Sequence, residues 1–188
     1  MSYIGKTPTA VPLTSSDITN GIITSAKLAS GVGGKVLQVV QAVNNSASAT
    51  SVSSWTDFPS LSASITPSSS SNKILIQYHA YLTLNNLAGM TRIIRGSTAI
   101  GIGASAGNRI LTTSHHMNKA TDANHGYHGF YGQFLDSPST TSATTYKLQL
   151  RSQGNSTCYI NRSSADANEG TYSSRSISTF TIFEVSAW

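Results

Sequence analysis

The segment YKLQLR at 146–151 alternates strictly between apolar and polar side chains. In an extended chain its apolar residues share one face and its polar residues the other, as in a β-strand with one buried face. A turn around Gly154 follows, and a second strand runs through Cys158 and Ile160. This hairpin contains nothing that resembles catalytic machinery, and it indicates an all-β scaffold.

Similar short strands continue along most of the chain. Turns rich in Ser and Asn separate them, and no helical pattern of useful length follows residue 34. Regular short strands with turn signals predict an antiparallel β-sandwich with a jelly-roll-like arrangement. The predicted strands lie at 35–43, 52–65, 73–84, 90–95, 98–103, 109–117, 125–135, 145–152, 156–162 and 175–186.

Residues 1–34 differ from the rest of the chain. Pro8 and Pro12 favour an extended path, residues 24–29 are compatible with one helical turn, and the glycines of 31–34 indicate a hinge. The few apolar residues of this segment are too sparse for a core of their own. We therefore predict an attachment and oligomerisation segment at 1–34 and a β-sandwich domain at 35–188.

Two of the predicted strands, 35–43 and 175–186, carry apolar side chains on both faces. Both faces of each strand must then be buried, and a domain of this size could cover one such strand with a loop but not readily two. We predict that these faces, together with the unsupported amino-terminal segment, are buried between subunits. The predicted interface residues are Ile18, Ile22, Leu28, Val36, Leu37, Val39, Val40, Phe180, Ile182 and Phe183.

The stretch SHHMNKATDANHGYHG at 114–129 holds the best candidates for a binding site. Histidine is a common metal ligand, but His-His and His-x-x-His spacings place the side chains on opposite faces of a strand. Metal binding, receptor contact and simple packing therefore stay open for the histidines, as do core packing and ligand contact for the aromatic residues of 125–134. We predict receptor contact for His115, His116, His125, Tyr127 and His128.

The formal net charge is +5, but only 10% of the residues are charged and the arginines are scattered singly. We therefore expect no nucleic-acid partner, and only weak attraction to an anionic surface. Asp166 and Glu169 form the one close acidic pair in the sequence. That pair is compatible with glycosidase carboxylates or a calcium loop, although a solvated turn is favoured. We expect no enzyme activity, no bound metal and no cofactor.

Cys158 is the only cysteine, so an intrachain disulfide is impossible, and its place in a strand predicts a small buried hydrophobe. No signal peptide is visible, and no apolar run approaches the roughly 18 residues needed to span a bilayer. We expect a protein that is made in a cytoplasm and has no membrane partner.

Several phrases resemble a β-rich module of tail-fibre and related virion proteins of tailed bacteriophages, especially phages of marine bacteria and cyanobacteria. MSYIGKTP at 1–8 resembles the amino terminus of such proteins, and DITNGIITSAKLASG at 17–31 resembles one unit of their shaft repeat. Because members are generally homotrimers, the resemblance implies a homotrimeric virion protein. The other matching phrases are KVLQVVQA at 35–42, LSASITPSSSSNKILIQ at 61–77, RGSTAIGIG at 95–103, FLDSPSTTSATTYKLQL at 134–150 and YINRS at 159–163.

These observations predict a non-enzymatic structural protein of the virion, made in the host cytoplasm. We expect a short tail fibre or adhesin in which residues 1–34 contact other tail or baseplate proteins. Its host partner would be a surface polysaccharide, bound through several weak sites on one particle. One alternative is a capsid or neck decoration fibre without a receptor. Another is a secreted domain that binds or cleaves carbohydrate.

Overall fold

The structure, a computed structural model, describes Thr14 and residues 35–84, 88–117, 128–170 and 173–187. The chain divides into two compact units, Met1–Lys35 and Val36–Trp188. Five residues with predicted roles lie outside the described part of the chain, namely Ile18, Ile22, Leu28, His125 and Tyr127.

The second unit is built from strands and one short 3₁₀ turn, Gln153–Asn155. The strands are β1 (Val36–Asn44), β2 (Ser48–Ser51), β3 (Thr56–Ile65), β4 (Lys73–Leu84), β5 (Ala88–Arg95), β6 (Thr98–Ile100), β7 (Ser114–Met117), β8 (His128–Asp136), β9 (Thr144–Ser152), β10 (Thr157–Ile160) and β11 (Ser178–Val185).

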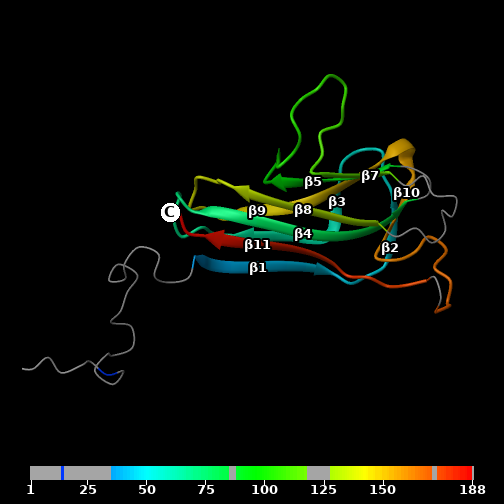
Figure 1. The fold of residues 1–188 in the computed structure, drawn as a ribbon, viewed down its shortest axis with the longest axis horizontal. Coiled ribbons are helices and arrows are strands. Elements are labelled where there is room, and N and C mark those ends of the chain that lie inside the picture. Colours follow the sequence, from blue (N-terminus) through cyan, green and yellow to red (C-terminus); the bar gives the residue numbers. More distant parts are fainter. Residues whose placement is uncertain (1–13, 15–34, 85–87, 118–127, 171–172, 188) are drawn as a thin grey trace, which may run out of the picture. The chain divides into compact units, whose positions relative to one another are not determined.

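The strands form two antiparallel sheets that pack face to face (Figure 1). The first sheet contains the order β1-β11-β4-β8, and β10 and β2 extend it beyond the end of β11. The second sheet has the order β3-β9-β5-β6, and β7 also pairs with β5. The first and last strands are neighbours in the first sheet, as the double Greek key of a jelly roll requires. The predicted antiparallel, jelly-roll-like sandwich is confirmed.

The core lies between the sheets, and in β9 strict alternation selects its residues. Tyr146, Leu148 and Leu150 of β9 are fully buried, whereas Lys147 and Gln149 lie on the other face, as their sequence predicts. Burying a large apolar side chain contributes about 1.5–3 kcal/mol, so the inward-facing set supplies most of the stability. Cys158 is also fully buried, and burial raises the pKa of its thiol to about 11, consistent with a packing role.

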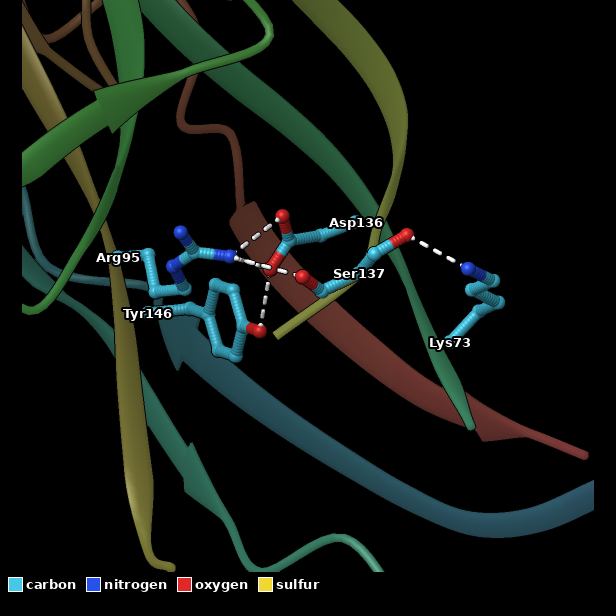
Figure 2. A network of polar contacts seen from close by, with 5 residues as sticks. All are labelled: Lys73, Arg95, Asp136, Ser137 and Tyr146. Carbon is cyan, nitrogen blue, oxygen red and sulfur yellow. Dashed lines mark hydrogen bonds and ion pairs between the residues drawn. The ribbon is translucent and has the colours of Figure 1, made fainter. Parts of the chain in front are cut away.

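A polar contact joins the two sheets at one end of this core (Figure 2). Asp136 of β8 accepts hydrogen bonds from Arg95 of β5, at 2.9 and 3.0 Å, and from the Tyr146 hydroxyl of β9, at 2.7 Å. Arg95 also donates to the Ser137 carbonyl, and Lys73 of β4 donates to the Ser137 hydroxyl. The carboxylate therefore ties strands of both sheets to one point, which resists sliding of one sheet over the other.

Glycines in β8 make room for aromatic rings. A Cβ at Gly132 would lie 2.1 Å from the ring of Tyr78, its cross-strand neighbour in β4. The Tyr78 hydroxyl shares a 2.8 Å hydrogen bond with Thr91 of the second sheet, and burial raises the pKa of Tyr78 to about 12. The alternation of glycine and aromatic residues here therefore serves core packing at Gly132.

Some strand boundaries differ from the predicted ones. The predicted strand at 109–117 is only β7, because residues 101–113 form a loop closed by a hydrogen bond from Gly103 N–H to the Thr112 carbonyl. Gly101 and Gly107 adopt positive φ angles in this loop, outside the extended region that regular strand residues occupy. The predicted turn at 44–51 contains β2, and β3 starts at Thr56 rather than at residue 52.

Candidate functional site

Four apolar side chains cross the outer face of the first sheet in one line. The strand register places Val39 of β1 beside Phe183 of β11, Phe183 beside Leu75 of β4, and Leu75 beside Leu135 of β8. Val39 is 57% exposed and Leu135 is 48% exposed, while Phe183 and Leu75 are half-buried. We call Val39, Phe183, Leu75 and Leu135 the apolar row. It is a continuous apolar band across four adjacent strands of this sheet face.

The apolar row includes only part of the predicted subunit interface. Val36 and Leu37 are 52% and 46% exposed at the start of β1, which leaves them available to another chain. The prediction is wrong for Phe180 and Ile182, which are fully buried in the core of their own chain. Val40 also packs against this core, because its register partner is Ile182 and both point inward.

A second line, made of polar side chains, runs parallel to the apolar row and lies two residues away from it along each strand. Gln41 donates a 2.9 Å hydrogen bond to Thr181, and Gln77 donates a 3.2 Å bond to Gln133. The next line contains His79 of β4 and Tyr131 of β8, whose rings stack with centroids 4.3 Å apart. The outer face of the first sheet therefore combines an apolar band with a hydrogen-bonding band, a surface suited to a protein partner.

The described histidines of the predicted contact site lie on two strands. His115 and His116 are exposed on β7, and His128 is half-buried at the start of β8. The His116 and His128 rings meet edge to face with centroids 4.0 Å apart, and the Nε2 of His128 is buried without a hydrogen-bond partner. Burial lowers the pKa of His128, and the charge of His116 lowers it further, so His128 packs in its neutral form.

Within the described ranges, no group of three His, Cys, Asp or Glu side chains is placed to hold a metal ion. His116 and His128 come together as a pair from two different strands, which their spacing in the sequence did not show.

His115 lines a pocket that the sequence did not predict. The pocket has a volume of about 420 Å³ and lies between β5, β7 and the loop 101–113, the green loop at the top of Figure 1. The predicted strands 98–103 and 109–117 include parts of this loop, although its glycines and Asn108 are a turn signal. The lining residues are Met90, Asn108, Arg109, Ile110, Thr112 and His115.

Asp166, one of the two acidic side chains that could form a catalytic pair, has basic partners. Asp166 forms ion pairs with Arg175 and, at 3.5 Å, with Arg162. Its loop borders a pocket of about 450 Å³ whose walls are residues 166–169 and 173–175. Because two guanidinium groups neutralise Asp166, this carboxylate stabilises the loop rather than offering a free base.

Glu184 is a buried carboxylate with a complete set of donors. It accepts hydrogen bonds from the Gln38 amide at 2.6 Å, from the Ser68 N–H and hydroxyl at 2.7 Å each, and from the Asn72 amide at 2.6 Å. Asn72 in turn accepts a hydrogen bond from the N–H of Ala187. These contacts fasten the loop before β4 to β1 and β11, so Glu184 has a structural role.

Comparison with solved structures gives matches to known proteins, whereas comparison of sequences does not. No family model matches the chain, and no curated protein sequence matches it. A solved structure of infectious bursal disease virus, Gx strain, is similar with a TM-score of 0.40 and 12% sequence identity. The likeness covers 80% of this chain and 37% of that chain, so the present chain spans well under half of the virus protein's length. In the part of the chain that the structure describes, no helix is both long enough and apolar enough to cross a membrane.

Proposed function

We propose that this chain is a non-enzymatic structural protein of a tailed-phage virion and that it assembles as a homotrimer. The observation that carries the proposal is the apolar row on the outer face of the first sheet. The sequence resemblance to phage fibre modules is the reason for proposing a phage particle and a trimer.

The apolar row favours burial against another chain. Its members lie in register on adjacent strands, so their side chains form one contiguous patch rather than scattered exposed residues. Contiguous apolar patches are uncommon on monomeric proteins, and removing such surface from water contributes roughly 25 cal/mol per Å². A closed ring of identical chains would cover the patch on every copy without leaving an open end.

The rest of the fold suits a rigid support for contact loops. The Asp136 and Glu184 contacts fix the sheets and the loop before β4, while the loop 101–113 and the exposed His115 and His116 stand at the surface. In the proposed short tail fibre or adhesin, residues 1–34 attach each trimer to other tail or baseplate proteins. Several copies on one particle then bind host surface polysaccharide by avidity.

Imaging of particles tests this function. Phage that carry the chain with an epitope tag at residue 188 should show the label at the tail. Removal of residues 1–34 should abolish this labelling of the particle, while the β domain itself stays soluble. A label on the capsid or neck would favour the decoration fibre instead. Particles without any label, from cells that make the tagged chain, would overturn the virion assignment.

A further inference from the structure

We propose that the surface around Met90, which comprises the pocket beside the loop 101–113 and the neighbouring Arg151, binds an anionic group of a polysaccharide, a carboxylate or a sulfate ester, through Arg109 and Arg151. The choice of a polysaccharide rests on the proposed host-contact function, whereas the choice of an anion rests on the residues around Met90.

Met90 is the centre of this surface. On the outer face of the second sheet, the register places Arg151 of β9 on one side of Met90 and His115 of β7 on the other. Met90 is only 7% exposed although it lies outside the core cluster. It lines the 420 Å³ pocket together with Arg109 and Ile110 of the loop. Three strands and a loop therefore bring two arginines and a histidine around one apolar floor.

Within the part of the chain that the structure describes, the positive charge at this surface has no acidic partner. Among the described residues, no carboxylate lies within ion-pair distance of Arg92, Arg109 or Arg151. The nearby Asp57 is paired with Lys147 at 2.7 Å. The buried Nε of Arg151 has no hydrogen-bond partner among the described residues.

Arg92 adds to the unbalanced charge. It lies two residues from Met90 on the same face of β5, donates to the Gln149 side-chain oxygen at 2.8 and 2.9 Å, and stacks over Trp55 at 4.3 Å. Burial lowers the pKa of Arg92, and repulsion by the positive charge of Arg151 lowers it further. An anion bound between them and Arg109 would relieve that repulsion.

The pocket also has the shape and chemistry of a sugar-acid site. Its volume falls within the range of about 300–1,000 Å³ that is usual for small-ligand sites. Guanidinium groups present paired N–H donors that match the oxygens of a carboxylate or sulfate. Arg109 is partly held in place, since its guanidinium donates to the Ala106 carbonyl at 3.1 Å. Met90 and Ile110 offer apolar surface to the carbon face of a sugar ring, and Asn108 and Thr112 offer hydrogen bonds.

Isothermal titration calorimetry on the full chain tests the site with dextran sulfate, polygalacturonate, neutral dextran and a single-stranded DNA oligomer as probes. The variants are Arg109→Gln and Arg151→Gln. The matched control is Arg175→Gln, which removes the same charge from an exposed arginine whose partner is Asp166. Because Arg109 is exposed on a loop, we expect its substitution to leave the fold intact. The Arg109→Gln variant therefore still tests the site if Arg151→Gln proves unstable.

We expect binding of dextran sulfate, polygalacturonate or both, and none of neutral dextran. Arg109→Gln should weaken that binding about tenfold, the effect of losing one charge-assisted hydrogen bond, and Arg175→Gln should change it less than about twofold. Binding of one polyanion alone would identify the group as a sulfate or a carboxylate.

Three results would overturn the inference: no polyanion binds, Arg109→Gln and Arg175→Gln weaken binding equally, or DNA binds as well as the polysaccharides with the same sensitivity to Arg109→Gln. None of these results bears on where the chain sits in the particle, which imaging tests separately.

Discussion

The hydroxyl of Tyr146 donates a 2.7 Å hydrogen bond to Asp136, and this bond crosses from β9 in one sheet to β8 in the other. Burial raises the pKa of the Tyr146 hydroxyl, and the neighbouring Asp136 charge raises it further, so the group remains a donor at neutral pH. Together with the Arg95 ion pair, this contact makes Asp136 the polar link between the sheets (Figure 2).

Replacing Asp136 by alanine should therefore be costly. The change leaves the buried Tyr146 hydroxyl without its acceptor and Arg95 without its partner, and we expect a loss of about 3 kcal/mol in the free energy of unfolding. Lys147→Ala is the matched control, since it breaks an ion pair with the exposed Asp57 and should cost less than about 1 kcal/mol. Urea denaturation measures both, and equal losses would contradict the assigned role of Asp136.

Gly132→Ala should destabilise the sandwich by about 1–3 kcal/mol, the usual cost of overpacking a core. The added methyl group would meet the Tyr78 ring, which is held by its bond to Thr91 and cannot easily move. Gly103→Ala provides the comparison, because nothing lies within 4 Å of a Cβ at that position. Thermal unfolding of the two variants should separate them, and unchanged stability of Gly132→Ala would show that Tyr78 is not fixed.

Glu184 should make the domain sensitive to acid. Burial by itself raises the pKa of this carboxyl, but the hydrogen bonds from Ser68, Asn72 and Gln38 outweigh burial and hold the pKa below its ordinary value of 4.5. A lowered folded-state pKa stabilises the fold above pH 4.5, and that contribution is lost as the pH falls through the lowered value.

The midpoint of thermal unfolding should thus fall as the pH drops below about 4.5 and through the lowered pKa of Glu184. Glu184→Gln should be less stable at pH 7 by about 1–3 kcal/mol, because an amide would turn a donor toward other donors. It should also show a shallower decline in acid. A decline as steep as that of the unsubstituted chain would mean that other carboxyls cause the acid sensitivity.

Local alternation was enough to predict β9 and its buried face. The period of two in 146–151 makes one face of the strand apolar and the other polar, so only the apolar face can be buried. Alternation did not predict which face of β11 is buried, because apolar residues occupy both odd and even positions of this strand. The structure resolves this through pairing, because Ile182 lies opposite Ile76 of β4 and Val40 of β1 in the core. Phe183 is on the outer face for the same reason, although nothing in the local sequence distinguishes it from Ile182.

The surface around Met90 could not be predicted from the sequence, because its residues come from distant strands and a loop. Arg151 and His115 come to flank Met90 only when β9 and β7 pair with opposite edges of β5. The loop that carries Arg109 also contains isoleucines, and these favoured a strand interpretation over the turn signal of its glycines.

The central claim is that the apolar row is buried between copies of this chain, and the mass of the protein in solution tests it most directly. Light scattering at micromolar concentration should give three times the chain mass for the full chain and for Met117→Lys, a change at another side chain that is 57% exposed. Leu135→Lys places a charge in the apolar row without disturbing the core, and it should reduce the mass to that of one chain. A monodisperse monomer for the unsubstituted chain, or an intact trimer for Leu135→Lys, would contradict the account.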